Sequence, residues 1–171
     1  MLKGFSHIDR PTQSSHDSRG ALGRTAHNAA MLGEDDVVDA VRAYLTERGW
    51  QYVSSAKAVG KQHGEDLVMK RGSTCLSVEA KGETSSDPDS TRYGEPFDSG
   101  QIASHIGRAV VTALGVVSTG ERRAAIALPA TTAHKSRVQR IAPALERLAV
   151  TVLWVAADRT VTAAPDALPA E

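Results

Sequence analysis

The stretch that decides the fold runs from Gly64 to Lys81 and reads GEDLVMKRGSTCLSVEAK. Its second half, Thr74 to Lys81, alternates between two sets of residues, and a period of two predicts a β-strand. Leu67 to Met69 is a short apolar run, and Arg71-Gly72-Ser73 supplies turn residues between the two segments. The sequence therefore predicts a β-hairpin.

The alternation assigns the side chains of the second strand to two faces. Leu76, Val78 and Ala80 fall on one face, and Cys75, Ser77, Glu79 and Lys81 fall on the other. Glu79 and Lys81 therefore project side by side, and the turn folds Asp66 back toward Glu79. Two carboxylates at the end of a hairpin make a hard oxygen site suited to Mg²⁺ or Mn²⁺, and a lysine beside them can orient or help deprotonate a water. The alternative is a solvated strand face whose surface ion pair contributes little.

Outward from the hairpin, helical and strand patterns alternate along the chain. The expected elements are a helix over Glu34 to Gly49, strands at Gln51 to Ala58, Ala124 to Leu128 and Thr151 to Val155, a helix from Ile102 to about Val117, and a further helix broken or kinked at Pro143. The order is helix, three strands, helix, strand, helix, strand. This order predicts an α/β fold with a central mixed β-sheet flanked by helices.

Composition limits the classes of protein that fit. The 171 residues suit one domain, and equal numbers of acidic and basic side chains, 20 each, mean that any nucleic-acid surface must be a local patch. Cys75 is the only cysteine, which excludes an internal disulfide and favours a cytoplasmic setting. We find no apolar stretch that approaches the roughly 20 residues needed to cross a bilayer, and so expect no membrane partner.

The two halves of the hairpin carry a family resemblance. Gly64-Glu65-Asp66-Leu67 followed by Glu79-Ala80-Lys81 resembles the bipartite motif of the PD-(D/E)xK, or restriction-endonuclease-like, nuclease superfamily. The expected element order also matches the αβββαβ core of that family. The sequence has Gly64-Glu65 where many members carry a proline before the acid, at a position that varies in the family.

The resemblance implies a function and a site. It implies a Mg²⁺ (or Mn²⁺) ion held by Asp66, Glu79 and the carbonyl of Ala80, with Lys81 at the attacking water. The protein would be a metal-dependent endonuclease or other phosphodiesterase that hydrolyses nucleic acid, with DNA as the leading substrate. Two alternatives stay open: a nuclease-fold module that does not cut and binds nucleic acid or a protein partner, and an unrelated α/β protein with an accidental motif.

Two more residues enter the candidate site by resemblance. Many family members place an acid like Glu34 on the first helix beside the metal, although a favourable interaction with the helix dipole explains Glu34 equally well. Gln101 is similar to a glutamine that several branches carry at the start of the helix after the motif. Its alternative, which the sequence slightly favours, is a capping box with Asp98 at the N-cap.

The domain boundaries follow from composition. Residues 1–33 read as a disordered or loosely attached arm, 34–163 as the nuclease-like domain and 164–171 as a tail. Basic residues that could contact a phosphate backbone surround the hairpin and the second helix: Lys57, Lys61, His63, Lys70, Arg92 and Arg108. Nucleases of this fold often pair two active sites, so a homodimer is a further expectation.

Overall fold

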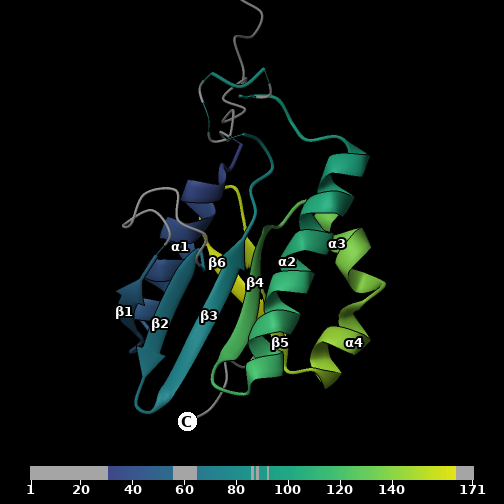
Figure 1. The fold of residues 1–171 in the computed structure, drawn as a ribbon. Helices are drawn as coiled ribbons and strands as arrows, with labels where there is room; N and C mark the ends of the chain where they lie inside the picture. The colour runs from purple at the N-terminus through teal and green to yellow at the C-terminus, as the bar shows by residue number, and fades with distance from the viewer. Residues whose placement is uncertain (1–30, 56–64, 86, 88, 92, 165–171) are drawn as a thin grey trace, which may run out of the picture.

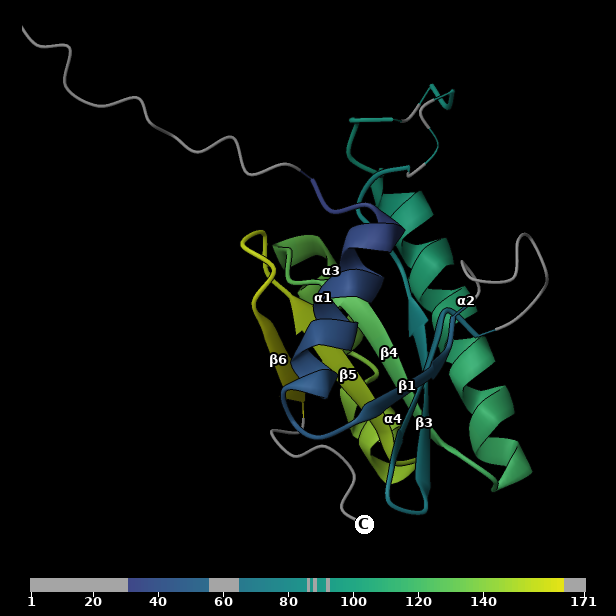
Figure 2. The ribbon, with the colours of Figure 1, turned by 90° about the vertical axis from the view of Figure 1, so that its left-hand side faces the viewer.

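Helices cover both faces of a six-stranded sheet in the computed structural model, which describes residues 31–55, 65–85, 87, 89–91 and 93–164. The helices are α1 (Glu34–Thr46), α2 (Ser99–Thr119), α3 (Thr132–Gln139) and α4 (Ala142–Arg147). The strands are β1 (Gln51–Ser54), β2 (Leu67–Arg71), β3 (Thr74–Ala80), β4 (Arg123–Pro129), β5 (Val150–Val155) and β6 (Val161–Ala164). Figures 1 and 2 show α1 on one face and α2, α3 and α4 on the other. The chain is therefore an α/β protein with an open mixed sheet.

The strands lie in the sheet in the order in which they occur in the chain. β1, β2 and β3 form an antiparallel meander, β3, β4 and β5 are parallel neighbours, and β6 is antiparallel to β5. Parallel neighbours need a crossover connection. The first crossover contains α2, which packs on β3 and β4, and the second contains α3 and α4.

The β2–β3 hairpin forms as the sequence predicts. Gly72 and Ser73 make a two-residue turn, and Gly72 has a φ of 57°, a conformation that glycine adopts without steric cost. The register pairs Leu67 with Val78. Asp66, one residue before β2, therefore comes level with Glu79 at the same end of the hairpin.

The sheet separates two apolar clusters, one on each face. α1 contributes Val37, Val41 and Leu45 to the first cluster, and α2 contributes Ile102, Ile106, Ala109 and Ala113 to the second. Strand β4 supplies Ala125 and Ala127 to the first and Ala124, Ile126 and Leu128 to the second. Both of its faces are buried, which explains why its sequence is a continuous apolar run.

The C-terminal third differs from the sequence-based expectation in two ways. Strand β6 was not predicted, because it is a four-residue edge strand in which only Ala163 is buried. The helix that was expected to be broken or kinked at Pro143 is broken into two helices, but the break lies slightly earlier, at Arg140 and Ile141. Pro143 occupies the first turn of α4, where its missing N–H has no partner to lose, so it starts a helix and does not kink one.

At the N-terminal boundary, the domain extends slightly into the predicted arm. Leu32 has only 3% of its surface exposed and joins the cluster under α1. Glu83 N donates to Leu32 O at 2.8 Å, and Leu32 N donates to Glu83 Oε1 at 2.9 Å. Residues 1–30 of the arm and 165–171 of the tail lie outside the described residues.

The expectation that no apolar stretch is long enough to cross a bilayer is wrong for helix α2. By length and composition alone, Ser99–Thr119 is long and apolar enough to cross a bilayer. In this structure the helix lies along the sheet with four residues buried in the second cluster. An amphipathic core helix of a soluble protein passes the same test of length and hydropathy.

Candidate active site

Glu34 is the first residue of α1, and the packing of that helix fixes where it lies. The helix is held against the sheet by fully buried side chains: Val37, Val41 and Leu45. At its start, Gly33 N donates to Asp36 Oδ2 at 3.0 Å, which satisfies a backbone N–H that the helix leaves without a partner. The side chain of Glu34 retains 43% exposure, so it lies at the edge of the domain.

The chain just after β3 passes so close to the start of α1 that no side chain fits at Gly82. A Cβ added to Gly82 would lie 2.6 Å from Glu34 N and 2.9 Å from Leu32 O, which are both backbone atoms. Only glycine fits this contact. The preceding residue, Lys81, is thereby brought next to Glu34, although the two are far apart in the chain.

The hairpin supplies the other two carboxylates. Asp66 Oδ2 accepts a hydrogen bond from Ala80 N at 2.7 Å, which fixes this carboxylate against β3. Lys81 N donates to Ala127 O at 3.0 Å and holds the end of β3 against β4. Asp66 and Glu79 have only 16% and 14% of their side-chain surfaces exposed.

The Lys81 ammonium lies at the centre of these groups. Lys81 Nζ is 2.8 Å from Glu79 Oε1, 3.2 Å from Glu34 Oε2 and 3.5 Å from Asp66 Oδ2. It also donates to Ala80 O at 2.5 Å. The side chain is 12% exposed, so the alternative of a solvated surface ion pair is wrong. We call Glu34, Asp66, Glu79 and Lys81 the ion cluster.

Burial and the neighbouring charges shift the pKa values of Glu34, Glu79 and Lys81. Burial raises the pKa of Glu79, and the hydrogen bond from Lys81 only partly offsets that effect. Burial likewise raises the pKa of Glu34 against the attraction of Lys81. For Lys81, burial lowers the pKa, but the hydrogen bond to Glu79 and the charges of Glu34 and Asp66 outweigh it, so the pKa lies above its ordinary value. Lys81 is thus a cation at neutral pH.

Helix α2 forms the opposite wall of a cleft beside the ion cluster. A hollow of about 700 Å³ is lined by Glu34, Glu79 and Lys81 on one side and by α2 residues that include His105 and Arg108 on the other. The His105 ring packs edge-on to Phe97 with 4.5 Å between centroids. Burial, and then the charges of Lys81 and Arg108, lower the pKa of His105.

His105 is a cleft residue that the sequence analysis did not identify. A signal for it exists, because it lies three residues after Ile102 and four before Ala109, at the border of the buried stripe of α2. Its Nδ1 is buried and has no hydrogen-bond partner among the described residues.

Gln101 has the local role that was the alternative to a catalytic one. Asp98 Oδ1 accepts from Gln101 N at 2.9 Å, and Gln101 Oε1 accepts from Asp98 N at 3.0 Å. This reciprocal pair is a capping box at the start of α2. The structure therefore brings together Glu34, Asp66, Glu79 and Lys81 and uses the Gln101 side chain in the helix cap.

The donor chemistry of the ion cluster suits a hard divalent cation. Three carboxylates and the carbonyl of Ala80 all direct an oxygen at one cationic atom, Lys81 Nζ, and oxygen donors are what Mg²⁺ and Mn²⁺ prefer. With the side chains as they lie, no group of three or more His, Cys, Asp and Glu residues in the described part of the chain is arranged to hold a metal ion. A divalent ion and the ammonium would compete for the same oxygen atoms.

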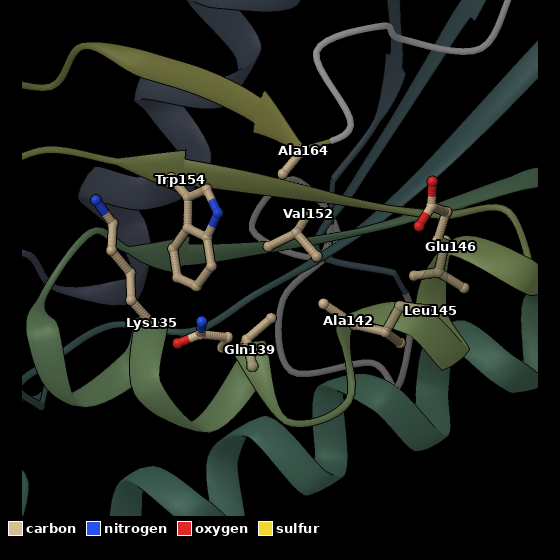
Figure 3. Close-up of a pocket in the computed structure, with 10 residues that line it drawn as sticks. Lys135, Gln139, Ala142, Leu145, Glu146, Val152, Trp154 and Ala164 are labelled. Atoms are coloured by element: carbon tan, nitrogen blue, oxygen red, sulfur yellow. The ribbon is translucent and has the colours of Figure 1, made fainter.

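Another pocket, which shares no lining residue with the cleft, lies between α3, α4 and the β5–β6 edge. It measures about 410 Å³ and has a mainly apolar lining. Figure 3 shows Lys135 and Glu146 at opposite ends of it, with Trp154 and Val152 between them. The two charged groups do not converge, so this pocket lacks the paired acids and bases that hydrolysis needs.

Of the basic residues named in the sequence analysis, Arg108 lines the cleft and Lys70 is exposed on β2. Lys57, Lys61, His63 and Arg92 lie outside the described residues. Comparison of the chain with protein-family models, curated proteins and solved structures gave no match.

Proposed function

We propose that this protein is a Mg²⁺-dependent nuclease with a restriction-endonuclease-like fold, which hydrolyses phosphodiester bonds in nucleic acid, with DNA as the leading substrate. One observation carries the proposal. The carboxylates of three acidic residues, from α1, β3 and the segment before β2, converge within 3.5 Å of the ammonium nitrogen of Lys81 at the edge of an open cleft. Such a group of buried charges in a cleft is typical of a catalytic site.

The residues divide the work by their chemistry. Asp66, Glu79 and the carbonyl of Ala80 would hold the metal, with Glu34 beside them. When bound, Mg²⁺ polarises a phosphate oxygen and lowers the pKa of water. The backbone N–H of Ala80 keeps Asp66 oriented through the 2.7 Å hydrogen bond.

Lys81 would act on the substrate and the attacking water. Its ammonium is positively charged, and in a mostly buried position its attraction for the charge that develops on the phosphate is larger than in bulk water. It can therefore stabilise the transition state and orient the nucleophile. Because its pKa is raised, Lys81 is suited to these two roles and not to that of a base.

A cleavage assay tests the proposal. Purified protein is incubated with duplex DNA, single-stranded DNA and RNA, each with Mg²⁺ and with EDTA, and the products are separated by electrophoresis. Glu79→Gln and Lys81→Met should abolish Mg²⁺-dependent cleavage. Glu146→Gln and Lys135→Met, which change charges at the pocket of Figure 3, are matched controls that should cleave at the wild-type rate.

A binding module without activity is the second candidate, and one observation favours it. Lys81 forms ion pairs with all three carboxylates at 2.8 to 3.5 Å, so the charges of the ion cluster are already paired without a metal ion. This candidate predicts no cleavage by the wild type with any substrate or metal.

The single thiol of Cys75 agrees with a cytoplasmic setting. A homodimer stays an expectation that the elution volume of the purified protein would check.

A further inference from the structure

The cleft beside the ion cluster continues as a groove along α2. One hollow, of about 700 Å³, and a second, of about 730 Å³, share two lining residues, Glu79 and Thr112. Together they follow α2 from Ser104 to Thr119. At 1.5 Å of rise per residue this length is roughly 22 Å. The candidate site thus lies partway along a groove and not at the bottom of a closed pocket.

The α2 wall of this groove has an unusual composition. Gly107 and Gly115 line it, and a Cβ added to either glycine would have no atom within 4 Å, so the wall is open there. Ser104 and Thr112 contribute hydroxyl groups. Within the described residues, no phenylalanine, tyrosine or tryptophan lines either hollow.

Two arginines lie in different parts of the groove. Arg108 lines the first hollow and Arg122 lines the second, with Glu79 common to both hollows. Arginine and hydroxyl side chains are the usual contacts to phosphate and sugar, whereas proteins that hold single strands stack the bases on aromatic rings. Among the described residues, the groove has arginine and hydroxyl groups, and the ring of His105 is the single aromatic ring in its lining.

From this arrangement we infer that the groove binds the sugar–phosphate backbone of a duplex nucleic acid, held by Arg108 and Arg122 in its two parts, in preference to a single strand held by base stacking. The inference rests on the proposed function, because it names the substrate form of the same site. It also identifies α2 as the element that positions the substrate over the ion cluster.

Acidic side chains outnumber cationic ones among the described residues of the groove. The described residues that line the two hollows include five acids, Glu34, Glu65, Asp66, Glu79 and Glu121, and three cations, Lys81, Arg108 and Arg122. Arg122 is paired with Glu65 at 2.7 Å, so a phosphate must displace Glu65 to reach it. Binding should therefore need a divalent cation, and Glu65 should weaken it.

Fluorescence polarisation with a labelled duplex and its labelled single strand tests the inference. Ca²⁺, another cation that binds oxygen ligands, replaces Mg²⁺ so that binding is measured without cleavage. Arg108→Ala and Arg122→Ala should each weaken duplex binding by roughly 5- to 10-fold and reduce the slope of log K against log salt by about one. Glu65→Gln should strengthen duplex binding, because it frees Arg122. Arg147→Ala, an exposed arginine on α4, is the control and should change nothing.

A substitution that changes no charge provides a second test. Gly115→Leu should raise the melting temperature, because leucine favours a helix more than glycine does, while the added side chain fills the groove and weakens duplex binding. Equal or tighter binding of the single strand, or arginine variants that behave like Arg147→Ala, would overturn the inference. Duplex binding that depends on both arginines without any Mg²⁺-dependent cleavage supports the groove and refutes the nuclease. Cleavage that is insensitive to both arginines refutes the groove alone.

Discussion

Replacing Lys81 by methionine should lower the stability of the protein and increase its response to Mg²⁺. The substitution keeps a long apolar stem and removes the charge that joins the three carboxylates. Lys81, Asp66 and Glu79 have only 12% to 16% of their side-chain surfaces exposed, so Asp66 and Glu79 would be left mostly buried and uncompensated. Glu34 is 43% exposed and contributes less, because water screens its charge.

The size of the effect follows from the burial. Breaking a buried ion pair by removing one partner costs about 3–5 kcal/mol, and because this cluster is partly exposed we expect the free energy of unfolding to fall by about 3 kcal/mol. For a domain of this length, each kcal/mol shifts the melting temperature by about 2–4 °C, which gives a decrease of about 6–12 °C. Mg²⁺ no longer competes with an ammonium, so saturating Mg²⁺ should recover much of that decrease in the variant and stabilise the wild type less.

Thermal unfolding followed by circular dichroism, with Mg²⁺ and with EDTA, measures both effects. Lys70→Met is the matched control, because Lys70 is an exposed lysine on the same hairpin, and it should unfold like the wild type. The reasoning is refuted if Lys81→Met melts within about 1 °C of the wild type in EDTA, or if Mg²⁺ shifts the two proteins equally.

Three further predictions concern the surroundings of the ion cluster. Gly82→Ala places a Cβ against backbone atoms of α1, so in thermal unfolding it should lower the stability of the protein by about 1–3 kcal/mol, and it should reduce cleavage. Gly107→Ala, on the open side of α2, should instead raise the stability by up to about 1 kcal/mol. Burial, then the charges of Arg137 and His105, lower the pKa of His134 to about 4 from 6.5. The contribution of His134 to the free energy of unfolding should thus be fully present above pH 6.5 and fall by up to about 3 kcal/mol as the pH drops toward 4, because in that range only the unfolded state takes up the proton. Denaturant titrations at several pH values should show a smaller loss in His134→Gln than in the wild type. An unchanged pH profile in that variant would contradict the prediction. Asp98→Ala should cost about 1 kcal/mol through the lost cap of α2 and leave the cleavage rate per folded molecule unchanged, and a large loss of rate in Gln101→Ala would show that Gln101 does more than cap.

The sequence was sufficient to predict the features of the ion cluster that depend on local pattern. Alternation and a Gly-containing turn give the hairpin, and the hairpin register alone brings Asp66 level with Glu79. The helical stripe of α1 likewise orients Glu34 toward the sheet, and the competition between capping and catalysis at Gln101 was visible in its spacing from Asp98.

The features that depend on packing between distant segments could not be predicted. Glu79 lies on the face of β3 on which α2 packs after a long loop, and a period-two pattern alone does not distinguish a solvated polar face from one that faces a helix. The contact between Gly82 and α1, which places Lys81 beside Glu34, has no local signature other than a glycine. Strand β6 was missed because an exposed edge strand of four residues carries almost no apolar pattern.

The identity of chain order and sheet order affects how the protein folds. Each strand pairs with the strand that precedes it in the chain, but the parallel pairs β3–β4 and β4–β5 can form only after their crossover connections have been made, and parallel pairing is slow. On the ribosome the chain emerges from its N-terminal end, and Glu34, Asp66, Glu79 and Lys81 all precede α2. The β1–β2–β3 meander and α1 are therefore synthesised before the helix that forms the opposite wall of the cleft. Until α2 is made, these side chains lack one wall of the cleft, so dissolved cations have freer access to them in the nascent chain than in the folded protein.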